Sequence, residues 1–224
     1  MSVFEFPQWT DKIRPWLGIL AIGIPVYVTG LFLFGAAPST INVGYAPDQP
    51  VPFSHALHAG ELGMDCRYCH TTVESAAHAA VPPSSVCMNC HERIHTESPK
   101  LLPVRESWAS GEPVEWMRVH DLPDFVYFNH AAHVTSGVSC VECHGRIDRM
   151  EKVRQEKPLS MGWCLDCHRD PDPNLRPRDK VTDLGWKPAG WTPEQDEKIR
   201  RETGARLREI HGIQPRTDCS TCHR

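Results

Sequence analysis

The sequence predicts a fold of loops and short α-helices with little β-structure, preceded by one long apolar helix. A five-residue motif, C-x-x-C-H, occurs five times in 224 residues. Twenty prolines and fifteen glycines interrupt long periodic segments, which argues against a regular sheet or helix bundle. One uncharged run, residues 17–37, stands near the N-terminus. These three observations define the expected architecture, and each is taken in turn below.

The five motifs use all ten cysteines of the chain and are numbered in chain order. The first to fifth motifs are Cys66/Cys69/His70, Cys87/Cys90/His91, Cys140/Cys143/His144, Cys164/Cys167/His168 and Cys219/Cys222/His223. This pattern attaches a c-type haem: two thiols bind the haem vinyl groups, and the following His supplies the proximal nitrogen to iron. Zinc sites and redox disulfides also use C-x-x-C, but neither needs a His after every second Cys. The sequence therefore predicts five covalently bound haems and a multihaem cytochrome c fold of class III type.

The haems would have to supply much of the core. The part of the chain after the apolar run offers only about 37 residues for each haem, fewer than a self-sufficient domain needs. We therefore expect loops and short helices wrapped round stacked haems. The net charge is −4 with His neutral. Lys and Arg are scattered, so no basic stripe indicates nucleic-acid binding.

The N-terminal segment, residues 1–37, predicts a membrane anchor. Its 21 uncharged residues, 17–37, would form a helix about 30 Å long, enough to cross a bilayer. Lys12 and Arg14 precede the run, and the next charge after it is Asp48, so the N-terminus should lie in the cytoplasm. A cleaved signal peptide is the alternative, but the run is longer than a usual signal-peptide core. We expect an uncleaved single-pass anchor in the bacterial inner membrane, with a periplasmic haem domain.

An internal repeat divides the remaining chain. After a Pro-rich tether at 38–52, the pattern F-x-H-x-x-H occurs at 53–58 and again at 128–133, an offset of 75 residues. Each copy is followed by two haem motifs. We therefore expect one di-haem module with a connector at 53–127 and a second module at 128–178.

The remaining segment, residues 179–224, should carry an amphipathic helix and the fifth haem. Thr192 as N-cap, Pro193 at the first position and Gln195 three residues after the cap predict the start of this helix. One face would carry Ile199, Thr203, Leu207 and Ile210, and Gly212 would end the helix.

The repeated histidines are the candidate distal iron ligands. In H-x-x-H on a helical turn, both imidazoles lie near one face, so they can bind two neighbouring irons, one each. We therefore expect His55, His58, His130 and His133 to be distal ligands. A fifth iron remains, for which Met161 is the first candidate and His120 or His95 the alternatives.

No catalytic residue is predicted. Six-coordinate irons leave no place for a substrate. A multihaem enzyme of the nitrite-reductase type would keep one iron open, often with a motif ending in Lys, whereas all five motifs here end in His. The pattern favours an electron carrier over an enzyme.

Four segments resemble a known family over nearly the whole chain. VPFSHALHAGELGMDCRYCH, VCMNCH, DLPDFVYFNHAAH and LSMGWCLDCHRDP are similar to the pentahaem cytochrome c subunit of bacterial alternative complex III. F-x-H-x-x-H alone also resembles class III multihaem cytochromes c. The resemblance implies a periplasmic electron-transfer subunit of a membrane complex that oxidises quinol and reduces a soluble carrier or a terminal oxidase. It implies as partners an iron–sulfur subunit related to molybdopterin enzymes, polytopic quinol-binding subunits and a monohaem cytochrome c.

A second function stays open, a self-contained quinol dehydrogenase like the small membrane-anchored tetrahaem cytochromes. A single membrane segment without ionisable residues at membrane depth favours dependence on partner subunits. Oxidation of a quinol analogue by the purified chain alone would favour the second function.

Overall fold

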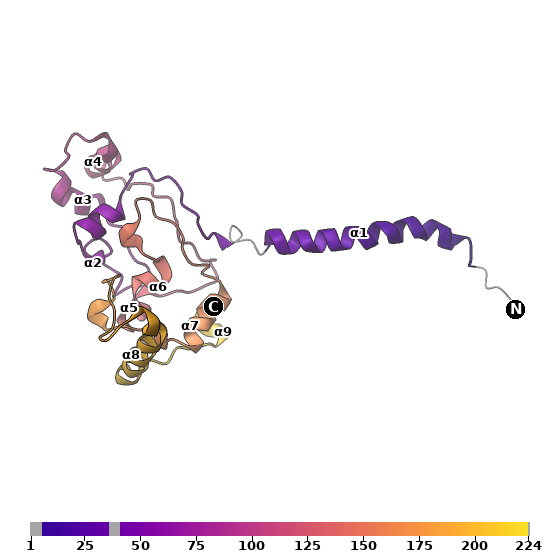
Figure 1. Cartoon of the computed structure of the whole chain (residues 1–224). Helices are drawn as coiled ribbons and strands as arrows, with labels where there is room; N and C mark the ends of the chain where they lie inside the picture. The colour runs from indigo at the N-terminus through magenta and orange to yellow at the C-terminus, as the bar shows by residue number, and fades with distance from the viewer. Residues whose placement is uncertain (1–5, 36–40, 224) are drawn as a thin grey trace. The chain divides into compact units, whose positions relative to one another are not determined.

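The computed structural model describes residues 6–35 and 41–223, and the chain divides into two compact units, Met1–Asn42 and Val43–Arg224. Figure 1 shows the elements of each. In its described residues, the first unit holds one helix, α1 (Trp9–Gly35). It is the one helix among the described residues that is long and apolar enough to cross a membrane, and none of its residues is buried.

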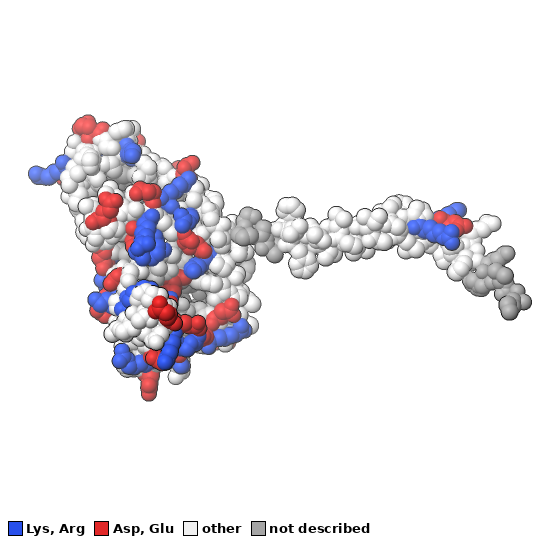
Figure 2. All heavy atoms as spheres, viewed as in Figure 1, with Lys and Arg blue, Asp and Glu red and all other residues white. Residues whose placement is uncertain are grey.

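α1 differs from the expected span at its start. It begins at Trp9, eight residues before the uncharged run, and contains both Pro15 and Pro25. Asp11, Lys12 and Arg14 therefore lie on the first turns of the helix instead of in a separate polar segment, and Arg14 pairs with Asp11 at 3.1 Å. The expected end, residues 36 and 37, lies outside the described residues. Figure 2 shows these charges gathered at one end of an otherwise uncharged helix.

The second unit is built from short helices and loops. Its α-helices are α2 (Cys66–Cys69), α3 (Ser84–His91), α4 (Leu102–Ser110), α5 (His130–Thr135), α6 (Cys140–His144), α7 (Met161–Arg169), α8 (Asp196–His211) and α9 (Cys219–Cys222). A π-helical turn, η2 (Ala56–Glu61), and the 3-10 turns η3 (Pro99–Leu101), η4 (Ile147–Arg149), η5 (Asp172–Asn174), η6 (Arg178–Lys180) and η7 (Pro193–Gln195) complete it. Within the described ranges β-structure is limited to two isolated bridges, Val126 with His223 and Val138 with Leu175.

Two small clusters form the side-chain core of this unit. Val51, Met88 and Val104 pack together, with Trp116 against them. Val73, Val134 and Val181 form the other cluster and so join segments from three parts of the chain. Only ten hydrophobic side chains of the described residues are buried. A domain of this length with so small a core needs further apolar surface, which agrees with the expected contribution of porphyrins.

Helix α8 is the amphipathic helix that the sequence predicts, with two corrections. It begins at Asp196, after the 3-10 turn η7, and the side chain of Thr192 caps nothing. Its buried residues are Gly204 and Leu207, whereas Ile210 is 66% exposed. The predicted stop is correct, since Gly212 ends the helix in the left-handed region at φ 61°. Leu207 of the predicted apolar face is therefore buried and Ile210 is not, while Gly204, outside that face, makes the close approach to η5.

Ion pairs hold α8 against η5 and the third motif. Arg208 donates to Asp172 of η5 at 2.6 Å, and Asp172 is buried. Arg200 and Arg176 both pair with Glu142, inside the third motif, at 3.2 and 2.8 Å. Both arginines share this one carboxylate, so Glu142 joins the C-terminal segment to the second module.

Replacing Gly204 with Ala should destabilise the domain by about 3 kcal/mol, because an added methyl group would overpack this contact. A Cβ at position 204 would lie 1.7 Å from the backbone oxygen of Asp172, so α8 would have to move away from η5. A lowered midpoint of thermal unfolding checks this. The exposed residue Glu209 supplies the control, and Glu209→Ala should leave the midpoint nearly unchanged. An unchanged midpoint for Gly204→Ala would contradict the tight contact.

Candidate haem centres

Each of the five motifs forms or ends a short helix. Its two cysteines stand three residues apart, so both thiols lie on the same face of one turn. Caps fix the start of several turns. Asp65 accepts from the backbone N–H of Arg67, Ser139 from that of Val141, and Ser160 from that of Trp163. None of the ten cysteines forms a disulfide, so each motif keeps both of its sulfurs for thioether bonds.

The ten motif thiols are not equally covered. Eight are half-buried, whereas Cys90 of the second motif and Cys219 of the fifth are exposed. In α3, Met88 packs into the side-chain core. Two residues further on, Cys90 is rotated by about 200° and faces the opposite side of the helix. Cys90 stays a proposed site of thioether attachment.

The motif histidines are oriented by hydrogen bonds at Nδ1. Four of them donate to a backbone carbonyl. The pairs are His70 to Ala80 at 2.8 Å, His91 to Ile94 at 3.1 Å, His168 to Arg216 at 2.7 Å and His223 to Phe125 at 3.2 Å. Such a bond fixes the tautomer and leaves Nε2 free to bind a metal. His144 of the third motif has a different partner, the Nε2 of His120 at 3.3 Å.

The two copies of F-x-H-x-x-H have nearly identical geometry, although η2 is π-helical and α5 is α-helical. The ring of Phe53 meets His55 edge-on at 4.8 Å between centroids and stacks on His58 at 4.4 Å. The ring of Phe128 meets His130 at 4.7 Å and His133 at 4.5 Å in the same two orientations. The sequence repeat is therefore also a repeat in space, in which the Phe separates and orients the two imidazoles.

Three imidazole pairs have the spacing expected on either side of one metal ion. The ring centroids are 6.2 Å apart for His58 and His91, 6.4 Å for His130 and His144, and 6.0 Å for His133 and His168. An imidazole nitrogen binds a transition metal at about 2 Å, so two trans imidazoles place their ring centres about 6 Å apart. The residues of these three centres therefore fit a bis-His haem iron.

His55 lies beside the first motif. Burial, followed by the neighbouring His70 and His58, lowers the pKa of His55 to about 4. Its Nδ1 is buried without a hydrogen-bond partner in the described structure. Burial likewise lowers the pKa of His130 and His133. All three imidazoles are thus held neutral, which is the form that binds a metal ion.

Side chains of the first motif contact those of the second and the third motifs. The side chain of Asn89, in the second motif, donates to the hydroxyl of Tyr68, in the first, at 3.1 Å. The thiol of Cys66, in the first motif, contacts that of Cys140, in the third, and this contact raises the pKa of Cys66. His130 also donates through Nδ1 to the carbonyl of Ala77 at 2.9 Å, which ties the second histidine pair to the first module.

The fourth and fifth motifs are neighbours as well. His168 donates to the carbonyl of Arg216, three residues before the fifth motif. Cys164 lies close enough to Cys222 for that thiol to raise its pKa, after the larger effect of burial. Met161, the proposed fifth distal ligand, begins α7 one turn before Cys164, and its side chain is 67% exposed.

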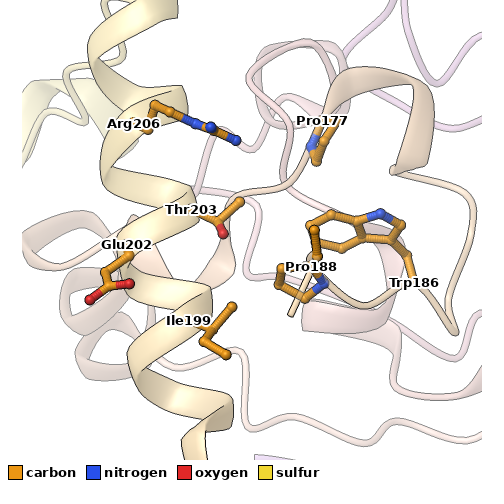
Figure 3. A pocket seen from close by; sticks show the side chains of 8 residues that line it. Pro177, Trp186, Pro188, Ile199, Glu202, Thr203 and Arg206 are labelled. Carbon is orange, nitrogen blue, oxygen red and sulfur yellow. The ribbon is translucent and has the colours of Figure 1, made fainter. Parts of the chain in front are cut away.

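A surface hollow lies outside the haem centres. Figure 3 shows it between α8 and the loop that carries Pro177, Trp186 and Pro188. Ile199, Thr203 and Arg206 line its α8 side. None of its described lining residues belongs to a motif or to a histidine pair. The predicted apolar face of α8 therefore borders this hollow in part, through Ile199 and Thr203.

Comparison with known proteins identifies the C-terminal part of the chain. Residues 126–224, which include the third to fifth motifs, match the family described as "Cytochrome c7 and related cytochrome c". The predicted fold class is thereby confirmed for this part of the chain: residues 126–224 match a multihaem cytochrome family, and the described residues are helical and without strands.

One curated relative is similar over part of its length. Over 98 residues the chain is 37% identical to the multiheme cytochrome c subunit of menaquinone reductase from Nitratidesulfovibrio vulgaris. The match covers 43% of this chain and 46% of the relative, so the chain spans about half the length of the protein it matches.

Proposed function

We propose that this chain is a pentahaem c-type cytochrome that conducts electrons within a membrane-bound quinol-oxidising complex. The observation that carries the proposal is the set of three imidazole pairs about 6 Å apart, since irons with two protein ligands exchange electrons without binding a substrate. A c-type haem held by such a pair supplies a one-electron Fe(III)/Fe(II) couple. The protein's own part is to hold each imidazole neutral, fix its tautomer and set neighbouring centres close together. No catalytic residue is assigned.

The distal ligands follow from the pairing. We assign His58 to the second motif, His130 to the third and His133 to the fourth, on the spacing of the rings. His55 is assigned to the first motif because, after burial, His70 of that motif has the largest effect on its pKa. Each histidine pair then bridges two irons, as the H-x-x-H spacing predicts.

The contacts also support an order of the five centres. The first histidine pair connects the second motif with the first, and the thiol contact of Cys66 with Cys140 connects the first with the third. The second histidine pair connects the third motif with the fourth, and α7 connects the fourth with the fifth. We infer the series second, first, third, fourth, fifth, in which the second and fifth motifs are the two ends for electron entry and exit. The two exposed thiols, Cys90 and Cys219, belong to these two end motifs.

The location and partners follow the resemblance to alternative complex III. We propose that α1 anchors the chain in the inner membrane, with the N-terminus cytoplasmic and the haem domain periplasmic. The proposed partners are an iron–sulfur subunit, polytopic quinol-binding subunits and a monohaem cytochrome c, with a soluble carrier or a terminal oxidase as acceptor. The relative named as a subunit of menaquinone reductase supports a link to a quinone, but its name favours the opposite direction, towards quinone reduction.

The intact mass of the purified chain tests the cofactor count and the anchor together. We expect the mass of the full polypeptide plus five haems, because the five motifs use every cysteine. A smaller number of haems would refute the pentahaem assignment. Loss of residues 1–37 from the mass would show a cleaved signal peptide instead of an anchor.

A quinol assay separates the proposed functions. Addition of a quinol analogue to the intact complex should reduce the haems, followed at their visible absorption, whereas the isolated chain should stay oxidised. Reduction of the isolated chain by quinol would favour a self-contained quinol dehydrogenase. Oxidation of pre-reduced haems by a quinone analogue, without the reverse reaction, would favour a quinone-reducing complex.

A further inference from the structure

The third motif differs from the other four in what orients its histidine. His70, His91, His168 and His223 donate to backbone carbonyls, which no side-chain substitution removes. His144 instead has Nδ1 3.3 Å from Nε2 of His120. The two rings meet edge-on, with 4.3 Å between centroids and an interplanar angle of 80°. Among the described residues, His120 is therefore the one side chain that is hydrogen-bonded to Nδ1 of a motif histidine.

The distances distinguish the two imidazoles that lie beside His144. His130 is 6.4 Å away between centroids, with its ring plane within 11° of that of His144, and has room for a metal between the rings. The 4.3 Å separation of His120 leaves no such room. Because His120 occupies Nδ1 of His144, Nε2 is the nitrogen that remains for iron. His120 and His130 therefore have different roles at this centre.

The protonation of the pair has one consistent arrangement. An imidazole that binds iron through Nε2 carries its proton on Nδ1. His144 is therefore the donor, and the unprotonated Nε2 of His120 is the acceptor.

The segment that carries His120 serves a second centre in the same way. Five residues further on, the carbonyl of Phe125 accepts from His223 of the fifth motif. The backbone N–H of Tyr127 then donates to the carbonyl of Cys222 at 2.8 Å. The connector between the two modules thus supplies the outer hydrogen-bond partners of two motif histidines that are far apart in sequence.

We infer that His120 is a positioning residue that orients His144 and lowers the reduction potential of the haem at the third motif. Acceptance of the Nδ1–H bond makes the ligating imidazole more basic. A more basic ligand stabilises Fe(III) over Fe(II), which lowers the potential. This inference rests on the proposed assignment of His130 and His144 to one iron. It also removes His120 from the candidates for the fifth distal ligand.

Redox titration of the full-length haem-loaded chain, followed by absorption, tests the inference. His120→Ala should raise the potential of one haem and leave the other four unchanged, with all five irons still low-spin. His120→Gln, whose amide oxygen can accept the same bond, should restore part of the shift. His211→Ala, at the exposed end of α8, is the matched control and should titrate like the natural protein.

Three outcomes would overturn the inference. The titration of His120→Ala could be unchanged, all five potentials could shift together, or one haem could become high-spin, which would make His120 an iron ligand. Failure of the proposed function is recognised separately, because it would appear in the unsubstituted chain as fewer than five haems or as high-spin iron.

Discussion

His58→Ala should convert one haem, that of the second motif, from low-spin to high-spin. Its ring centroid stands 6.2 Å from that of His91, and the alanine variant leaves this iron with a single protein ligand. His55→Ala should likewise convert one haem, that of the first motif, because His55 lies beside His70. Electron paramagnetic resonance of the oxidised chain gives the number of high-spin irons in each variant.

The double variant makes this test decisive. If the two histidines bind different irons, His55→Ala with His58→Ala should yield two high-spin haems, one from each site. If both approached the same iron, the double variant would show only one, and the bridging arrangement would be wrong. His78→Ala serves as the control, because His78 is a histidine outside the motifs and outside both pairs.

The local features of this fold were predictable, because they depend on residues close in sequence. The C-x-x-C-H motif, the F-x-H-x-x-H repeat and the Gly212 stop each act within one or two turns. The start of α8 was not predicted correctly, because Pro193 and its neighbours adopt a 3-10 turn and the helix begins at Asp196. The close approach of Gly204 to η5 was not predictable either, because it depends on a distant segment.

The pairing of ligands depends on tertiary contacts that the sequence does not specify. H-x-x-H indicates that two irons are bridged, but not that His58 faces the second motif while His55 faces the first. The role of His120 was missed for the same reason. It stands 24 residues before His144, and only folding of the connector brings the two rings together. The only sequence signal for such a role was that His120 is a histidine outside the H-x-x-H pairs.

In the proposed assignment, the iron of the fifth motif requires a ligand from outside the histidine pairs. Because the fifth motif follows the fourth in the proposed order of centres, Met161 at the start of α7 is the candidate. In this assignment, the pairs supply one imidazole to each of the first four motifs. Met161 stands one turn before Cys164, and Cys164 lies beside Cys222 of the fifth motif. We therefore propose that the thioether of Met161 binds the iron held by His223. The alternative is that Met161 only packs on a porphyrin, as methionines in irregular cores often do.

Met161→Leu and Met161→His should separate these two roles. A thioether ligand raises the reduction potential relative to imidazole. Met161→His should therefore lower the potential of one haem, leave the other four nearly unchanged and keep all five low-spin. Met161→Leu keeps the volume but removes the sulfur, so one haem should become high-spin. Met150→Leu, at a buried methionine, is the control and should change neither property. Five low-spin haems in Met161→Leu, with an unaltered titration, would show that another residue, such as His95, holds the fifth site.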